Sequence, residues 1–258
     1  MIYFVGAGPG AADLITVRGK GLIEHCNQLI YAGSLVNPAL LDFAKKDCEI
    51  FNSASMTLEE ITGRFVYGEE RGWLTVRLHT GDPSIYGAIR EQIDRLVSLS
   101  IPFQVVPGVS SFCGAAAALN AEYTLPGVSQ TLIISRAPGK TTVPPREDLA
   151  ALAAHGASMA IFLSAALAGE VRQKLLDAGL PPETPAALVY KATWPEQKIV
   201  RGTVGELEAM QRELGADRTA LILAGGFLAD DYERSKLYDP DFSHGFRGGG
   251  GLTLFNEH

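Results

Sequence analysis

Short apolar runs and longer segments of helical periodicity alternate along the chain, which is typical of a protein built from successive strands and helices. In the first half, each apolar run of strand length is followed by a break rich in Gly, Pro or Asn and then by residues with helical spacing. The runs predict strands at residues 1–5, 29–31, 48–51, 73–78 and 103–106. Such alternation favours right-handed crossovers and a largely parallel sheet.

A second series of apolar runs begins after residues 120–126, where the periodicity is interrupted and a Leu-Pro-Gly sequence follows. The later runs predict strands at residues 130–135, 159–163, 185–190 and 219–223. We therefore predict an α/β protein with two α/β domains, residues 1–119 and residues 126–258. The glycine-rich tail, residues 245–258, is expected to be mobile unless another segment holds it.

The segment Trp73–Gly87 is the stretch around which we expect the chain to be organised. Its apolar part predicts a half-buried strand, and Asp82 and Pro83 have the residue types preferred at the N-cap and first position of a helix that begins at once. Asp82 would then be no more than a helix cap. Ligands of open α/β sheets, however, bind beyond the carboxyl ends of the strands. We therefore expect this loop to line a ligand crevice.

Composition and charge narrow the possible partners. The chain has 258 residues, 47% hydrophobic and 20% charged, with a formal net charge of -7. These values are typical of a globular protein, and an acidic chain lacks the positive surface expected of a nucleic-acid-binding protein. The first ten residues have no basic segment, and no apolar run has the length of a membrane span. We expect a cytoplasmic protein that binds neither nucleic acid nor membrane.

The cysteines and histidines indicate no metal centre and no disulfide framework. The three cysteines, Cys26, Cys48 and Cys113, are odd in number and far apart in the sequence. The five histidines show neither the spacing of metal ligands nor adjacent carboxylates. We expect each histidine to be a surface residue or a packed one, and we predict no metal site.

The glycine-rich turn at residues 6–10 invites comparison with a dinucleotide-binding loop. Pro9 occupies the position where backbone amides should face a pyrophosphate, and no acidic residue follows Tyr31 to bind a ribose. An NAD-dependent oxidoreductase is therefore disfavoured but kept as an alternative. Ser110 and Ser111 lie at a predicted helix start without a Gly-x-Ser-x-Gly elbow, which favours helix capping, compatible with ligand contact through backbone amides.

Four motifs occur in the order and spacing of a known family. They are VGAGPG at residues 5–10, TGDPSIYG at 80–87, PGVSS at 107–111 and ATWPEQ at 192–197. Together they resemble the tetrapyrrole methylase family over nearly the whole chain. The resemblance implies an S-adenosylmethionine-dependent methyltransferase with two α/β domains, a cofactor cleft between them, and a homodimeric assembly. Segments 31–38, 114–119 and 129–133 look like the subgroup that methylates precorrin-4, or its cobalt form, at C11 in cobalamin synthesis.

Carried over position by position, the resemblance implies a set of cofactor contacts in both halves of the chain. These are Pro9, Gly81, Asp82, Ile85, Ser110, Ser111, Leu163, Ala192 and Ala220, with Tyr86 beside them in the same loop. Apolar and small residues suit a site that binds adenine by shape and through main-chain hydrogen bonds. The substrate implied is a tetrapyrrole with many carboxylates, so nearby cations are candidate substrate contacts: Arg18, Arg136, Lys140 and Lys191.

Methyl transfer from a sulfonium is an in-line displacement, so orientation of donor and acceptor supplies most of the catalysis. We find no His-carboxylate pair to act as a general base, and we assign no catalytic residue. Two alternatives stay open besides the oxidoreductase. One is a member of the same family that acts on another tetrapyrrole carbon, such as a uroporphyrinogen-III methyltransferase, and the other is a non-enzymatic module that senses the cofactor or a tetrapyrrole.

Overall fold

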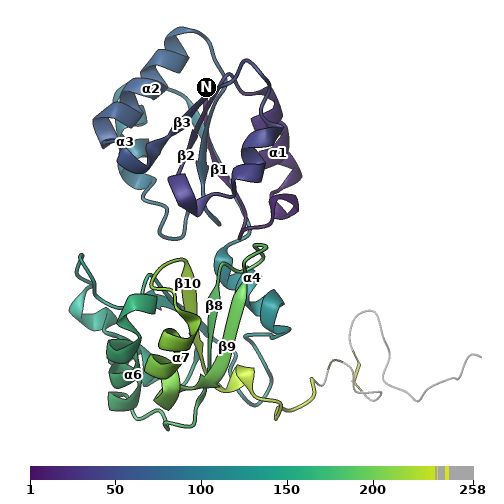
Figure 1. The fold of residues 1–258 in the computed structure, drawn as a ribbon, viewed down its shortest axis with the longest axis vertical. Coiled ribbons are helices and arrows are strands. Elements are labelled where there is room, and N and C mark those ends of the chain that lie inside the picture. The colour runs from purple at the N-terminus through teal and green to yellow at the C-terminus, as the bar shows by residue number, and fades with distance from the viewer. Residues whose placement is uncertain (236, 238–241, 244–258) are drawn as a thin grey trace, which may run out of the picture.

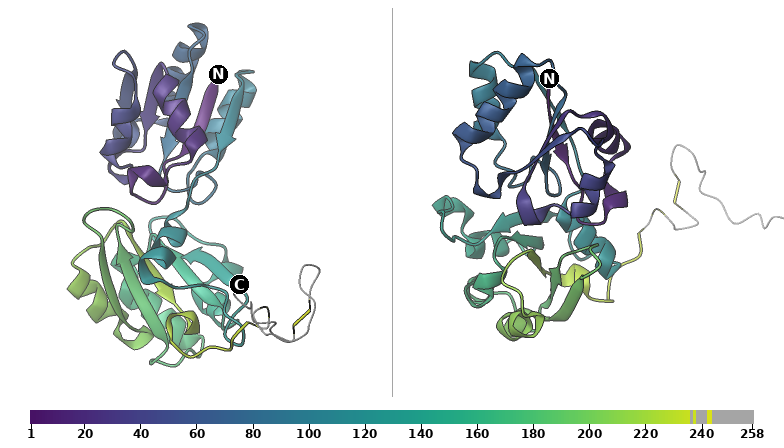
Figure 2. Two further views of the ribbon diagram at one scale, coloured as in Figure 1. Left: turned by 90° about the vertical axis from the view of Figure 1, so that its right-hand side faces the viewer. Right: turned by 45° about the horizontal axis from the view of Figure 1, so that its top comes forward.

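The computed structural model describes residues 1–235, 237, 242 and 243, so the glycine-rich tail lies outside the described residues. The described chain forms two five-stranded sheets with helices packed on them. Figures 1 and 2 show these as two lobes, one holding the first sheet and α1 to α3, the other holding the second sheet and the remaining helices. The predicted α/β class is confirmed. Within this part of the chain, no helix is both long enough and apolar enough to cross a bilayer.

The first sheet is parallel throughout and has the strand order β3-β2-β4-β1-β5. Its strands are β1 Ile2–Gly6, β2 Gln28–Tyr31, β3 Glu49–Asn52, β4 Thr75–His79 and β5 Phe103–Val106. The parallel arrangement predicted from the alternation of strands and helices is therefore confirmed for this half. Because β4, β1 and β5 are neighbouring parallel strands, the loops that follow them lie side by side at the carboxyl ends of the strands.

Helices cover both faces of the first sheet. The helix α1, Val17–His25, packs on one face through Ile23, and its N-cap Thr16 accepts a hydrogen bond from the Gly19 amide. The opposite face is covered by α2, Leu58–Glu70, and α3, Arg90–Ser98. Thr57 and Glu60 form a capping box at the start of α2, as the sequence favours for a threonine followed three residues later by a glutamate.

The central strand β4 is buried along its whole length, so the prediction of a half-buried strand was wrong. The strand lies between β2 and β1, and helices cover both of its faces. Val76 and Leu78 point to the side of α1, whereas Arg77 and His79 belong to the other side. The alternation of polar and apolar residues thus arises from buried polar groups and not from solvent exposure.

The helix predicted to begin directly after Asp82 begins only at Arg90. Tyr86 and Ala88 have φ angles of 54° and 49°, in the left-handed region that interrupts a right-handed helix. Residues 83–86 therefore form a turn after the carboxyl end of β4. Asp82 orders this turn and does not cap a helix.

The second sheet is mixed and has the order β6-β7-β10-β8-β9. Its strands are β6 Leu132–Arg136, β7 Ser158–Phe162, β8 Pro185–Tyr190, β9 Lys198–Thr203 and β10 Ala220–Ala224. Only β6 and β7 pair in parallel; the contacts of β10 with β7 and β8, and of β8 with β9, are antiparallel. The short β8–β9 connection contains no helix, which is why these two strands run in opposite directions.

Helices also cover both faces of the second sheet. On one face lie α5 Leu149–Ala153, α6 Ala168–Asp177 and α7 Leu207–Leu214. On the other face lies α4, Ser111–Leu119, whose Ala115, Ala116 and Leu119 pack with Tyr123 and Phe227. The helix α4 precedes the predicted boundary yet packs on the second sheet, as Figure 1 shows. The division into residues 1–119 and 126–258 stays a prediction.

The connections between these elements include short 3-10 helices. They are η1 Ala12–Leu14, η2 Gly33–Leu35, η3 Pro38–Phe43, η4 Ser53–Ser55, η5 Pro145–Glu147, η6 Ala165–Leu167, η7 Val204–Glu206 and η8 Gly226–Leu228. The segment η2 and the loop before η6 reach the space between the two sheets, where the candidate site lies.

Candidate functional site

Three loops of the first half meet backbone to backbone at the carboxyl ends of β1, β4 and β5. The Gly81 amide donates to the Gly8 carbonyl at 2.9 Å, and the Gly8 amide donates to Gly81 at 3.3 Å. Gly6 and Gly108 approach each other so closely that a Cβ on Gly6 would lie 2.5 Å from the Gly108 Cα. Only residues without a side chain fit this crossing, and it fixes the position of all three loops.

Asp82 ties two of these loops together. Its Oδ1 accepts hydrogen bonds from the Ser84 amide at 2.8 Å and from the Ser84 hydroxyl, and its Oδ2 accepts one from the Gly108 amide at 2.8 Å. Burial alone would raise the pKa of Asp82, but these hydrogen bonds outweigh it and hold the pKa below its usual value. Their stabilisation is therefore present near neutral pH and is lost as the pH falls through the lowered pKa.

A loop of the second half, residues 191–197, packs against the glycine turn after β1. The Thr193 hydroxyl accepts a hydrogen bond from the Ala11 amide at 2.9 Å. The Trp194 ring lies against Gly10, where a Cβ would be 2.0 Å from its Cδ1 atom. This loop has a strained backbone, with positive φ at Lys191 and at Thr193. The contacts join the two halves of the chain on one side of a cavity.

The cavity between the halves has a volume of about 330 Å³. All ten residues predicted to contact the cofactor line it: Pro9, Gly81, Asp82, Ile85, Tyr86, Ser110, Ser111, Leu163, Ala192 and Ala220. They come from three loops of the first sheet and three segments of the second. The fold therefore brings together residues separated by more than two hundred positions in the sequence.

Several lining residues were not predicted from the sequence. They are Leu35, Thr80, Phe162, Ser164, Ala165, Val189, Trp194, Asp217, Arg218, Thr219 and Leu221. Three of them lie within segments that carry the family resemblance: Leu35 in residues 31–38, Thr80 in TGDPSIYG and Trp194 in ATWPEQ. The pair Asp217 and Arg218 lies in an exposed turn before β10, and no sequence signal marks it.

The serines after β5 do not act as the caps that their position favours. Ser110 occupies the N-cap position of α4, but its side chain accepts no hydrogen bond from the helix. It is nevertheless buried, with 6% of its surface exposed, and it lines the cavity together with Ser111. The hydroxyl of Ser110 is thus available to a ligand.

Of the four cations predicted to bind the substrate, Lys191 alone lines the cavity described here. Its Nζ lies 3.5 Å from Glu196 and 4.8 Å from the centre of the Trp194 ring. Arg18 is exposed at the start of α1, and Lys140 is exposed in the loop after β6. These two cations therefore lie outside the group that forms the cavity.

Arg136 also lies outside the cavity lining, and its guanidinium is used to order a loop. It donates hydrogen bonds to the carbonyls of Ala137, Thr141 and Thr142, at 3.2, 3.1 and 2.7 Å. Its charge nevertheless acts on Tyr86 at the cavity. Burial raises the pKa of the Tyr86 hydroxyl, and the positive charge of Arg136 partly opposes this shift. Arg136 is therefore close to the cavity without forming its wall.

Tyr86 makes a second contact between the two halves of the chain. Its ring lies 5.3 Å from the ring of Phe162, the last residue of β7. Beside this pair, Leu163 has a φ angle of 53° and leaves 71% of its surface exposed. An exposed leucine in a strained conformation next to an aromatic pair is an apolar surface suited to contact a ligand.

Beneath the loop of Asp82, β4 buries two basic side chains. Arg77 donates hydrogen bonds to the Gln92 side chain at 3.1 Å and to the Ile30 carbonyl at 3.3 Å, and burial lowers its pKa to about 10. His79 is 4% exposed, and its Nε2 atom has no hydrogen-bond partner. Burial, assisted by the positive charge of Arg77, lowers the pKa of His79 to about 3. His79 is therefore neutral throughout the physiological range.

The neutrality of His79 predicts a pH-dependent loss of stability. The unfolded chain takes up the proton near pH 6.5, whereas the folded chain does so only near pH 3. Stability from this group is complete above pH 6.5 and falls as the pH approaches 3. Between these values the wild type should lose about 1.4 kcal/mol more per pH unit than His79→Gln. Urea unfolding at several pH values measures the difference, and equal slopes would show that His79 titrates normally.

The glycine turn offers few free amides to a phosphate. The Ala7 amide donates to the His79 carbonyl at 2.7 Å, and the amides of Gly8 and Ala11 are bonded to Gly81 and Thr193 as described. A dinucleotide-binding loop needs such amides to face a pyrophosphate. The geometry therefore disfavours the oxidoreductase alternative, in agreement with the missing acidic residue after Tyr31.

Comparison with known protein families identifies the family of this chain. The family model of the tetrapyrrole (corrin/porphyrin) methylases matches residues 1–208. The match covers most of the chain, so the chain belongs to this family, and its class of enzyme is therefore a methyltransferase.

Individual relatives are more specific. A cobalt-precorrin-4 C(11)-methyltransferase of Methanocaldococcus jannaschii is 49% identical over 247 residues, which cover 95% of each chain. A precorrin-4 C(11)-methyltransferase of Sinorhizobium sp is 43% identical over 251 residues, 96% of this chain and 99% of that protein. A solved structure of a cobalt precorrin-4 methyltransferase superposes with a TM-score of 0.86 at 44% identity and covers 88% of this chain and 95% of that one.

Proposed function

We propose that this protein transfers a methyl group from S-adenosylmethionine to C11 of precorrin-4 or of cobalt-precorrin-4, a step of cobalamin synthesis and so of porphyrin-related biosynthesis. The observation that carries the proposal is that one cavity is lined by all ten residues predicted to contact the cofactor. The chain is also similar, over nearly its whole length, to proteins named for this reaction. The fold and the motifs alone would support only the class.

The cavity fits the donor in size and in chemistry. A volume of about 330 Å³ lies within the range of small-molecule sites. The small residues Ala192 and Ala220 in its lining leave room for a flat ring. The Asp82 carboxylate is ionised, so it can attract a positively charged group. When bound, S-adenosylmethionine supplies an electrophilic methyl group on a sulfonium.

The residues of this chain then contribute to catalysis by holding and orienting the donor. The crossing of Gly6, Gly81 and Gly108 holds the donor loops rigid, and the 191–197 loop closes the cavity from the second half. A rigid cavity orients the methyl group toward the acceptor carbon, which lowers the entropic part of the barrier. The acceptor carbon of a reduced tetrapyrrole is electron-rich, so the reaction needs no protein nucleophile.

We propose that the carboxylates of the acceptor are held by Lys191, which lines the cavity, and by three cations beyond its lining, Arg18, Arg136 and Lys140. We expect Arg136→Ala to raise the apparent KM for the tetrapyrrole about tenfold, the cost of one charge-assisted hydrogen bond, and to leave the affinity for S-adenosylmethionine unchanged. Steady-state kinetics measure the KM for the tetrapyrrole, and titration calorimetry measures the affinity for S-adenosylmethionine. Lys198→Ala, which removes an exposed lysine outside the cavity lining, serves as the control. Equal KM values for the two variants would remove Arg136 from the substrate site.

The reaction itself is tested with a donor labelled with ¹³C in its methyl group. We expect conversion to S-adenosylhomocysteine only when precorrin-4 or cobalt-precorrin-4 is present, with the label at C11 in the NMR spectrum of the product. Label on uroporphyrinogen III would instead establish the other reaction within the family. Binding of donor and tetrapyrrole without turnover would establish a sensing module. Parallel assays with and without cobalt in the acceptor decide between the two forms.

We further propose that the enzyme is a cytoplasmic homodimer, an assembly supported by the family resemblance. Light scattering coupled to size exclusion is expected to give twice the mass of 27.5 kDa. A mass of one chain would contradict the dimer.

A further inference from the structure

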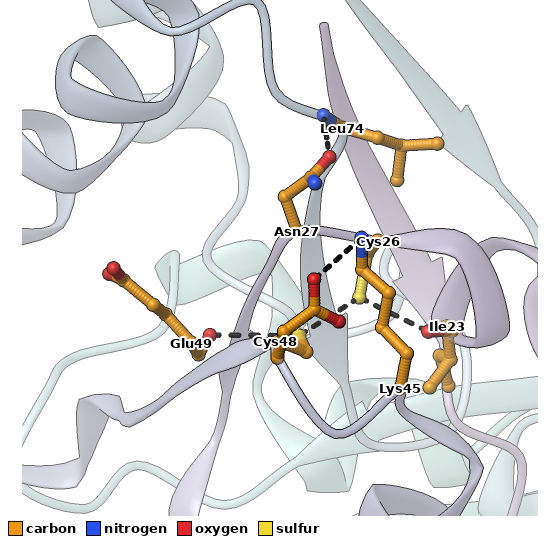
Figure 3. A network of polar contacts seen from close by, with 8 residues as sticks. Ile23, Cys26, Asn27, Lys45, Cys48, Glu49 and Leu74 are labelled. Carbon is orange, nitrogen blue, oxygen red and sulfur yellow. Dashed lines mark hydrogen bonds and ion pairs between the residues drawn. The ribbon is translucent and has the colours of Figure 1, made fainter.

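Two of the three cysteines, separated by 22 positions in the sequence, meet in the structure. The Sγ atoms of Cys26 and Cys48 are 3.4 Å apart (Figure 3). This pair could not be predicted from the sequence, because the spacing of the two cysteines matches no disulfide or metal motif. The fold creates the contact, since Cys26 directly follows α1 and Cys48 directly precedes β3.

The backbone holds both cysteines in place. Cys26 donates its amide hydrogen to Ile23 at 3.4 Å, and Cys48 donates to Lys45 at 3.0 Å. Between them, the Glu49 amide donates to the Asn27 carbonyl at 2.9 Å, which continues the parallel pairing of β2 and β3. The contact between the sulfurs is therefore set by two paired strands and not by a flexible loop.

The two thiols differ in access and in charge. Cys26 is fully buried, whereas Cys48 is half-buried and open to small solutes. The hydrogen-bonding contact between the two thiols lowers the pKa of Cys48, and the same contact, together with burial, raises the pKa of Cys26. Lys45 adds positive charge near both sulfurs, opposed at Cys48 by Asp47 and Glu49. Cys48 is thus the sulfur that can react first.

We propose that Cys26 and Cys48 are an oxidisable dithiol that a low-molecular-weight disulfide converts into an intramolecular disulfide. The Cys48 thiolate attacks one sulfur of the small disulfide and expels a thiolate, which leaves a mixed disulfide on Cys48. Cys26 then loses its proton and attacks the Cys48 sulfur, expelling the second thiolate. Two cysteine thiols are oxidised, and one small disulfide is reduced to two thiols.

A disulfide is favoured over metal binding at this pair. Among the described residues, no three His, Cys, Asp or Glu side chains gather in a way that could hold a metal ion. The disulfide would enclose residues 27–47, which include Leu35 at the cavity and Asn37, whose side chain donates to the Gly10 carbonyl at 2.8 Å. Oxidation would thus restrain the segment that supports one wall of the cavity.

The experiment treats the purified full-length protein with oxidised glutathione at neutral pH, quenches with an alkylating agent and maps the peptides by mass spectrometry. We expect a Cys26–Cys48 link with the loss of two hydrogens, glutathione retained on the exposed Cys113, and a rise in Tm that a dithiol reductant reverses. Cys113 reports that the oxidant has reacted.

Two variants test the order of the steps. In Cys26→Ser, the glutathione adduct should persist on Cys48, because the resolving thiol is gone. In Cys48→Ser, Cys26 should stay reduced while Cys113 reacts. Stable glutathione on Cys48 in the wild type, or a fully reduced pair after Cys113 has been modified, would overturn the proposal. Because the wild-type protein gives these readouts, the test does not depend on the variants folding.

Discussion

Gly108→Ala should strongly destabilise the folded protein. The added methyl group would lie 2.2 Å from the Gly81 carbonyl oxygen and 2.7 Å from the Gly6 Cα, both of them backbone atoms of neighbouring strands' loops. Neither can move without separating the loops that follow β1 and β4. We expect the free energy of unfolding to fall by about 3–5 kcal/mol, as for severe overpacking of a rigid site. Urea denaturation measures the loss, and donor binding should disappear with it.

The matched control is Gly21→Ala on the helix α1, where a Cβ would meet nothing within 4 Å. Alanine is the better helix former, so this variant should be unchanged or more stable by up to about 1 kcal/mol. If Gly108→Ala unfolded at the same urea concentration as Gly21→Ala, the close crossing of the three loops would not exist as described.

The second large effect is expected from Asp82→Ala. This change leaves the amides of Gly108 and Ser84 without their acceptor and releases the loop that carries Ser110 and Ser111 toward the cavity. We expect the unfolding free energy to fall by about 1–3 kcal/mol, the cost of losing hydrogen bonds to a charged group. The Kd for S-adenosylmethionine should rise by about tenfold to a hundredfold, since two cavity walls and one carboxylate are affected.

Asp148→Ala is the control variant. It removes a carboxylate that has only a structural role, so it separates loss of stability from loss of donor binding. Asp148 caps α5 by accepting from the Ala150 amide at 2.9 Å and forms a salt bridge with Lys174, away from the cavity lining. Its replacement should cost about 1 kcal/mol of stability, as for other helix caps, without changing donor affinity. Calorimetry measures the donor affinity of both variants, and urea denaturation measures their stability. Normal donor affinity in Asp82→Ala, with lowered stability, would reduce Asp82 to a structural residue.

The local pattern of the sequence was sufficient to predict most of the strands. β1, β2, β5 and β8 have the predicted positions within a residue or two, because a short apolar run bounded by Gly, Pro or Asn has few alternatives. The helix after Asp82 was misplaced for a tertiary reason. Tyr86 and Ala88 adopt left-handed conformations at the cavity edge, which local propensity does not predict.

Some residues of the candidate site could also be predicted from local sequence, and others could not. Residues within motifs, such as Pro9, Gly81 and Ser110, could be carried over by position, and the fold gathers them at the carboxyl ends of three neighbouring strands. Exposed cations carry no such information, since a long charged side chain in a loop has the same sequence signature whether or not it faces a site. The Cys26–Cys48 contact was missed because it depends on how β2 and β3 pair.

We propose that one cavity between the two sheets holds the methyl donor. A crystal structure of the protein grown with S-adenosylhomocysteine, supported by calorimetry of the same sample, tests this proposal. We predict ligand density between the Gly81 loop and Ala192, in contact with Ser110 and Ala220. Density at another place, or no binding at millimolar ligand, would show that this cavity does not hold the donor.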